Sequence, residues 1–176
     1  MNALHRYRGL CAGFVAVALL CGETAAAATL PTPEAALIAA VNAERAAAGL
    51  GSLAPDGRLA CAARAHARDL AAHDRFEHSG SDGGDLATRL GRVGYAYRMA
   101  AENLALAGAA AGEIVALWRA SPGHNRNMRQ SAARAAGAAR VRGTDGRYIW
   151  VLVVAAEMTK ILQKPPILAN CDAIPG

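Results

Sequence analysis

Beyond its N-terminal segment, the sequence lacks an apolar run long and uninterrupted enough to cross a membrane. It also lacks a cluster of basic residues. The 19 lysines and arginines, set against 14 acidic residues, are nearly all arginine, and apart from Arg6 and Arg8 they are spread from Arg45 to Lys164. Nucleic-acid binding needs a basic patch on one surface, so this scatter argues against a nucleic-acid partner. Internal repeats are absent as well, which favours a single domain.

The first 28 residues have the pattern of a secretory signal peptide. Arg6 and Arg8 form a basic start, the apolar segment LCAGFVAVALLC follows, and the small residues of ETAAAA predict cleavage after Ala28. The apolar segment is too short to span a bilayer. We therefore expect an exported protein, extracellular or periplasmic, with no transmembrane anchor after cleavage. The alternative is an N-terminal helix that stays attached as an anchor.

Cleavage would leave two cysteines, Cys61 and Cys171. An even number of cysteines in an exported chain predicts a disulfide between them. In the chain-entropy model, a loop of this length stabilises the fold by about 4–5 kcal/mol. Two unpaired thiols are the alternative.

Helical patterns fill the first two thirds of the remaining chain. Thr32 is a suitable N-cap for a first helix, with Pro33 and Glu34 in its first turn, and Gly49 ends it. Asp85 is a candidate cap for a short helix in the stretch DLATRLGRVGY. The inward positions of that short helix are Leu86, Leu90 and Val93.

A second helix is predicted within residues 53–76, where four residues form one stripe at helical spacing: Leu59, Ala63, His66 and Leu70. His66 is therefore expected to be a packed, hydrogen-bonded core histidine. Cys61 lies roughly on the opposite side, where a C-terminal tail could reach it.

The segment AAAGEIVALWRA predicts a further helix, anchored by Ile114, Leu117 and Trp118. The stretch SPGHNRNM follows it and is predicted to be a polar turn, with Gly123 allowing a close bend and Met128 packed inward. The earlier stretch AENLALA is interpreted only as a short apolar segment.

The hydrophobic period changes near the C-terminus. The segments GAARV and YIWVLVVAAE predict a β-hairpin with its turn near Asp145 and Gly146. The continuous run from Ile149 to Ala156 favours a strand that is covered on both faces. Helices followed by strands indicate an α+β fold, with helices packed on a small antiparallel sheet.

Three residues are candidates for chemistry: His78, Glu102 and His124. Each lies where an element meets a loop, a place where functional side chains are often exposed on a rigid scaffold. Two imidazoles and a carboxylate could hold a divalent metal such as zinc with an open fourth position, or act in proton transfer. They could equally form a structural hydrogen-bond network that binds nothing. The sequence has no H-x-x-x-H motif, so spacing alone does not bring them together.

The order FEHSGSDGGD, AENLA, W-x-x-SPGHNRNM, GAARV and YIWVLVVA resembles the CAP superfamily, which comprises cysteine-rich secretory proteins, antigen 5 and pathogenesis-related 1 proteins. The resemblance covers about residues 34–156 and is strongest to the short bacterial secreted members. It implies an α-β-α sandwich with a central cleft lined by two histidines and acidic residues. His78 corresponds to the family's His-Ser motif, Glu102 to its Glu-Asn motif and His124 to its Gly-His motif.

The chain departs from the family pattern at two positions. Many members have a glutamate three residues after the tryptophan, where this chain has Ser121, and a glycine where it has Ala101. The cleft is therefore expected to have three members unless Asp82 supplies a carboxylate. The predicted site consists of His78, Glu102 and His124, with zinc as the implied metal, and Asp82, Ser121 and Asn103 beside them.

The N-terminal pattern predicts a signal peptide over 1–28. The resemblance predicts a CAP domain over 29–160, followed by a C-terminal tail over 161–176. The function it favours is a monomeric, secreted binding module for a small apolar ligand, a cell-wall component or a protein partner. The alternative is a metal-dependent hydrolase in which the histidines and Glu102 hold zinc and an activated water. No nucleophile motif accompanies Ser79 or Ser121, which weakens the hydrolase interpretation.

Overall fold

The computed structural model describes residues 30–108 and 110–158. The described residues from Pro31 to Met158 belong to one compact unit. The predictions about the signal peptide, about Cys171 and about the tail over 161–176 lie outside the described residues. Within those residues, no helix is both long and apolar enough to cross a membrane.

The centre of the fold is a four-stranded sheet in the order β1-β3-β4-β2. β2 (Tyr97–Ala107) and β3 (Ala135–Arg142) flank β4 (Tyr148–Glu157), and both pair with it in antiparallel orientation. The short edge strand β1 (Ala54–Pro55) pairs with β3 in parallel. The hairpin β3–β4 confirms the sequence prediction. The stretch AENLALA, in contrast, belongs to a full strand, β2, which pairs with β4 along its length.

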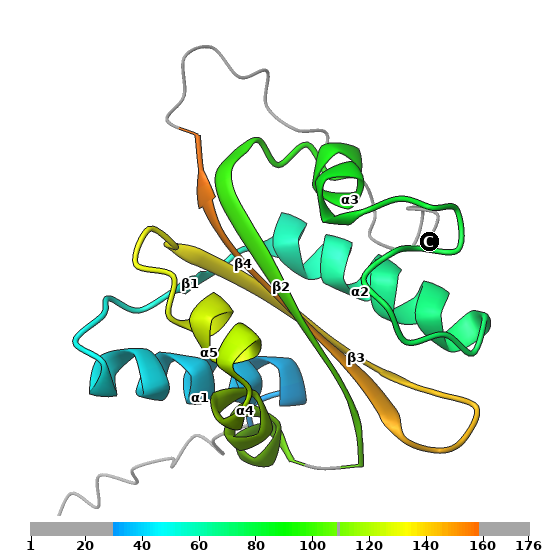
Figure 1. Ribbon diagram of the computed structural model, residues 1–176, viewed down its shortest axis with the longest axis horizontal. Helices are drawn as coiled ribbons and strands as arrows, with labels where there is room; N and C mark the ends of the chain where they lie inside the picture. The colour runs from blue at the N-terminus through cyan, green and yellow to red at the C-terminus, as the bar shows by residue number, and fades with distance from the viewer. Residues whose placement is uncertain (1–29, 109, 159–176) are drawn as a thin grey trace, which may run out of the picture. The chain divides into compact units, whose positions relative to one another are not determined.

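Five helices cover the two faces of this sheet (Figure 1). α2 (Gly57–Ala72) and α3 (Leu86–Arg92) cover one face. α1 (Pro33–Ala47), α4 (Ala111–Ala120) and α5 (Pro122–Met128) cover the other. The architecture is therefore the expected α-β-α sandwich of the α+β class.

β4 is buried on both faces, as its continuous apolar run predicts. Trp150, Leu152 and Val154 pack into the cluster beneath α1 and α4. Ile149, Val151 and Val153 alternate with them and pack against α2 and α3. Because side chains of a strand alternate between faces, a strand at the centre of a three-layer fold must be apolar at every position.

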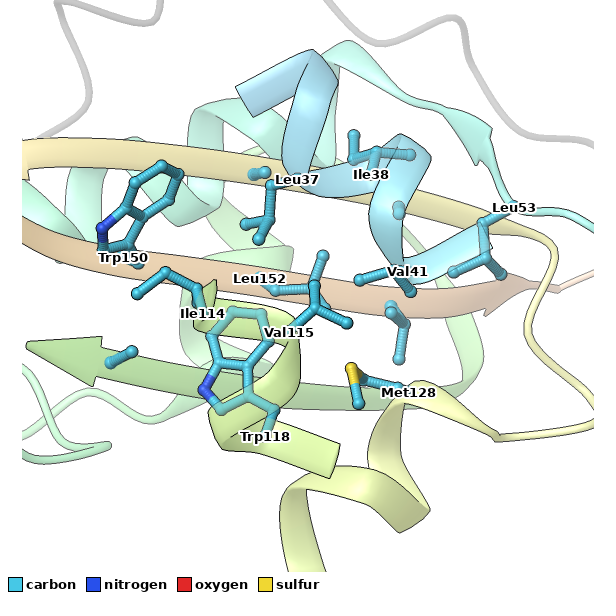
Figure 2. Packing of buried hydrophobic residues seen from close by; sticks show 14 of the residues in the cluster. Leu37, Ile38, Val41, Leu53, Ile114, Val115, Trp118, Met128, Trp150 and Leu152 are labelled. Carbon is cyan, nitrogen blue, oxygen red and sulfur yellow. The ribbon is translucent and has the colours of Figure 1, made fainter. Parts of the chain in front are cut away.

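The cluster beneath α1 and α4 contains Trp118, whose indole shares this cluster with Leu152 and Met128 (Figure 2). The indole Nε1 donates a hydrogen bond to the Leu104 carbonyl, at 2.9 Å. The prediction that Leu117 anchors α4 is wrong, because its side chain is 56% exposed. Ile114, Val115 and Trp118 form the buried stripe of α4 instead.

Local capping signals place the helices where the sequence predicts them. The Thr32 hydroxyl accepts from the Ala35 amide at the start of α1, and Gly49 adopts a positive φ of 70° just after its end. The Asp85 carboxylate accepts from the Thr88 amide at the start of α3. Side-chain acceptors at these positions satisfy amides that have no partner within the helix.

The stretch SPGHNRNM is a short helix, α5, and not the predicted turn. Ser121 is its N-cap residue and Pro122 stands in its first turn, where proline's fixed φ suits a helix and its missing N–H costs nothing. Gly123 has no positive φ, and a Cβ added there would meet nothing within 4 Å. Gly123 therefore does not make a bend, and His124 is presented by the first turn of a helix.

Arg45 holds the segment that follows α5. Its guanidinium is fully buried and donates to the carbonyls of Met128, Gln130 and Gly51, at 2.8, 2.9 and 2.8 Å. Burial lowers the pKa of this arginine, and the positive charge of Arg134 lowers it further. These backbone acceptors compensate the buried cation and hold α1 against the end of α5.

Gly137 on β3 marks the closest approach between α2 and the sheet. A Cβ at this position would lie 2.1 Å from both the Ala60 nitrogen and the Leu59 carbonyl carbon. These are backbone atoms of the helix and cannot move aside independently. A methyl group here would therefore force the helix away from the sheet.

We expect Gly137→Ala to destabilise the protein by about 3 kcal/mol, because overpacking a well-packed contact strains the backbone. Gly123→Ala is the control, since it adds the same methyl group in open space within a helix and should change stability by less than about 1 kcal/mol. Urea denaturation of both variants measures the effect. Equal midpoints for the two variants would show that α2 does not lie this close to β3.

Candidate functional site

His78 lies on the loop between α2 and α3, and polar side chains of α2 hold that loop. His66 Nε2 lies 3.1 Å from the Glu77 carbonyl oxygen. The Asp69 carboxylate accepts from the Ser81 amide at 2.7 Å and from its hydroxyl at 2.5 Å. His66 is fully buried, which confirms the prediction of a hydrogen-bonded core histidine. The two anchors fix the loop on both sides of His78.

Glu102 comes from β2 and is directed toward α2 and α3. Its side chain is only 3% exposed, whereas that of His78 is 61% exposed. His78 Nδ1 lies 2.9 Å from Glu102 Oε1, and His66 Nε2 lies 3.7 Å from the same oxygen. One buried carboxylate oxygen is therefore shared by a core histidine and an exposed histidine.

Arg89 on α3 neutralises this carboxylate and was missed as a site residue. Its Nη2 lies 3.0 Å from Glu102 Oε1 and 2.9 Å from Oε2. The same guanidinium donates to the carbonyls of His78 and Gly84, at 3.2 and 3.1 Å. Arg89 is three residues after Leu86 and four before Val93, so it lies on the inward stripe of α3. A charged residue on an apolar stripe was the available signal.

The environment separates the pKa values of the histidines. The hydrogen bond to Glu102 raises the pKa of His78. Burial lowers the pKa of His66, against the opposing effect of the Glu102 charge. Burial also lowers the pKa of His124, and the nearby positive charge of His78 adds to this effect. His78 is thus the histidine in this group that most readily carries a proton.

His124 lies near His78 but belongs to the other layer. Its ring stands 6.4 Å from that of Trp118, measured between centroids. Its backbone carbonyl accepts from Asn103 Nδ2 at 3.0 Å. Within 30–108 and 110–158, no hydrogen bond or ion pair joins the ring of His124 to Glu102. Of the three candidates, only His78 and Glu102 are in direct contact.

The three residues expected beside the site have other contacts. Asp82 does not supply a carboxylate to it, because Oδ1 accepts from the Gly84 amide and Oδ2 pairs with Arg92. Ser121 caps α5. Asn103 is buried, and its side chain braces α5 by bonding His124 and Asn127. Asn103 therefore positions a neighbouring element.

An open pocket of about 390 Å³ lies beside His78 and Glu102. Its polar lining residues are His78, Ser79, Asp85, Tyr97 and Glu102, and its apolar ones are Leu86, Ala87 and Ala100. The pocket lies between α3 and the edge of the sheet at β2. Since Nδ1 of His78 is bonded to Glu102, Nε2 is the ring nitrogen left for a ligand.

The residues present do not fit the three-ligand zinc centre that the sequence suggests. Arg89 occupies both oxygens of Glu102, and Ser121 replaces the family's additional glutamate. Within the part of the chain that the structure describes, no three His, Cys, Asp or Glu side chains are grouped so that they could hold a metal ion. Zinc binding at His78, Glu102 and His124 therefore stays a prediction from the sequence.

Comparison with known proteins identifies the family. The family model of the cysteine-rich secretory protein family, CAP, matches residues 38–154. YkwD, an uncharacterised protein of Bacillus subtilis, is 30% identical over 105 residues, which are 60% of this chain and 41% of YkwD. The chain therefore spans less than half the length of this curated relative.

Solved structures share the fold. An outer surface protein of Borrelia burgdorferi has a TM-score of 0.64 at 22% identity, covering 69% of this chain and 90% of its own. An extracellular SCP-domain protein of Bacillus anthracis has a TM-score of 0.61 at 23% identity, covering 71% and 40%. A cysteine-rich secretory protein of Staphylococcus aureus has a TM-score of 0.61 at 19% identity, covering 75% and 40%.

The family match extends from α1 to β4 and so takes in every element that builds the pocket. His78 on the loop after α2, Glu102 on β2 and His124 on α5 all lie within the matched residues. This chain belongs to the cysteine-rich secretory protein (CAP) family.

Proposed function

We propose that this chain is an exported binding module whose pocket beside His78 takes a polar cell-wall component, without the help of a metal ion. The observation that carries the proposal is the lining of that pocket, where an exposed imidazole stands over a buried, neutralised carboxylate. The N-terminal signal pattern supports export, and the printed descriptions of the relatives from B. anthracis and S. aureus, extracellular and secretory, agree with it.

The chemistry of the lining favours a wall fragment over the other two expected ligands. Ser79, Asp85 and the ring of His78 offer hydrogen bonds to hydroxyl or amide groups. Leu86, Ala87 and Ala100 offer a small apolar surface that could cover a methyl group or a sugar face. A purely apolar ligand would leave these polar groups unpaired, and a protein partner would need a broader surface than this pocket.

The alternative function, a metal-dependent hydrolase, draws support from the contact between His78 and Glu102. An exposed imidazole bonded to a buried carboxylate is an arrangement used for general-base catalysis. The metal-dependent version would also require Glu102 as a ligand, and Arg89 holds both of its oxygens. Turnover of peptides, esters or wall fragments that stops with chelator and returns with zinc would favour the hydrolase.

The binding proposal is tested with soluble disaccharide–peptide fragments of bacterial wall, and with palmitate as the apolar probe, by calorimetry. We expect the wall fragments to bind and chelator to change nothing. His78→Ala should weaken binding about tenfold, as expected for one lost hydrogen bond in a pocket. Ala87→Leu should fill the pocket and weaken binding further.

Ala116→Leu is the matched control for Ala87→Leu. Both alanines are exposed on helices, but Ala116 lies on α4, away from the pocket lining. If palmitate binds and Ala87→Leu removes this binding, the pocket takes an apolar ligand and the proposal of a wall fragment is wrong. If neither probe binds, or if both leucine variants bind like the parent, the pocket is not the site.

The hydrogen bond between His78 and Glu102 predicts which histidine has the higher pKa. By side-chain NMR, His78 should titrate above the ordinary value of about 6.5 and His124 below it. Glu102→Gln should lower the His78 pKa by removing its charged acceptor. Because the folded-state pKa of His78 is raised, its contribution to stability is present below the unfolded pKa and is lost as pH rises through the folded pKa. A His78 pKa below that of His124 would contradict the observed contact.

A further inference from the structure

Arg89 occupies the position at which a metal ion would bind Glu102. Its Nη2 is nearly equidistant from the two carboxylate oxygens, at 3.0 and 2.9 Å. Zinc would bind a carboxylate at about 2.0–2.2 Å from oxygen, through lone pairs that here accept from Nη2. The guanidinium and a metal bound by both oxygens would therefore compete for one space.

The guanidinium cannot leave this space by losing its proton, because arginine stays charged at any ordinary pH. It is also held from other sides. The carbonyls of His78 and Gly84 accept from it at 3.2 and 3.1 Å, and the residue is only 5% exposed. A divalent cation would have to displace a buried positive charge that already has four acceptor atoms.

We propose that Arg89 is the residue that keeps divalent metal out of this pocket, as a built-in cation that satisfies Glu102 in place of a metal. It is a specificity-determining residue, since it leaves His78 as a hydrogen-bonding group for an uncharged or polar ligand. This inference concerns the same pocket as the proposed function and rests on it for the ligand. The part of the inference that concerns metal exclusion does not depend on the proposed function.

The contacts that His78 and His66 already make also keep these two histidines from forming a set of metal ligands with Glu102. His78 uses Nδ1 to bond Glu102, and His66 Nε2, 3.7 Å from the carboxylate, also faces the Glu77 carbonyl. If the arginine is removed, the Glu102 carboxylate beside His78 loses its resident cation. Loss of Arg89 should then create metal affinity where the parent protein has little.

The test is a zinc titration by calorimetry of the chelator-stripped protein at about pH 7.5, above the ordinary histidine pKa of about 6.5. We expect Arg89→Gln to bind zinc at least about tenfold more tightly than the parent, a change of the size that altered surroundings of metal ligands produce. Arg89→Lys keeps a cation and should show no gain. Arg89→Gln combined with Glu102→Gln should return to the parent level. Zinc affinity of Arg89→Gln that equals or falls below that of the parent would overturn the proposal, since a residue that only supports the fold could not increase metal binding when removed.

A second measurement keeps the proposal testable if Arg89→Gln does not fold. In the otherwise unchanged protein, Glu102→Gln should leave zinc affinity as it is, because Glu102 is not available as a ligand. A loss of zinc binding on Glu102→Gln would show that Glu102 coordinates metal despite Arg89, and the proposal would fail.

The two proposals fail in different ways. Binding of the wall fragments is measured with chelator present, so its absence rejects the ligand and leaves the metal titrations intact. Tight zinc binding by the parent through Glu102 rejects the role of Arg89, whatever the fragments do.

Discussion

The buried carboxylate of Glu102 is the constraint on which the pocket depends. An ionised carboxylate away from water is tolerated only when a positive charge and hydrogen bonds compensate it. Arg89 and His78 provide that compensation here, and removing one partner of such a pair costs about 3–5 kcal/mol. Because Arg89 also bonds the carbonyls of His78 and Gly84, the contacts that satisfy Glu102 also shape the loop that forms the pocket wall.

The Glu-Asn pair on β2 organises both faces of the sheet at once. Neighbouring residues of a strand point to opposite faces, so Glu102 meets α3 while Asn103 meets α5. Asn103 Nδ2 donates to the His124 carbonyl, and Asn127 Nδ2 donates to Asn103 Oδ1 and to the Glu102 carbonyl, at 3.0, 3.0 and 3.1 Å. Two adjacent polar residues therefore fix the loop that carries His78 and the helix that carries His124. Neither layer could shift without breaking one of these bonds.

Features that depend on neighbours in the chain could be predicted from the sequence, whereas features that depend on distant residues could not. The caps Thr32 and Asp85 act within three residues, and the run of β4 encodes its own burial. β2 contains no β-branched residue, so propensity does not mark it as a strand. Its existence depends on pairing with β4, about fifty residues away. The stretch SPGHNRNM is predicted to be a turn and is a helix, because the role of Pro122 at a helix start depends on the residues after it.

The same distinction explains why the site was only partly predictable. The family motifs single out His78 and Glu102, which are in contact in the structure, but a motif transfers residue identities and not the groups that surround them. A carboxylate with a free lone pair beside an imidazole is a metal ligand, whereas the same carboxylate under a guanidinium is half of an ion pair. The difference lies in Arg89, on a helix outside the motifs. What neutralises Glu102 decides which chemistry the two histidines can take part in, and that choice is visible only once α3 is packed against β2.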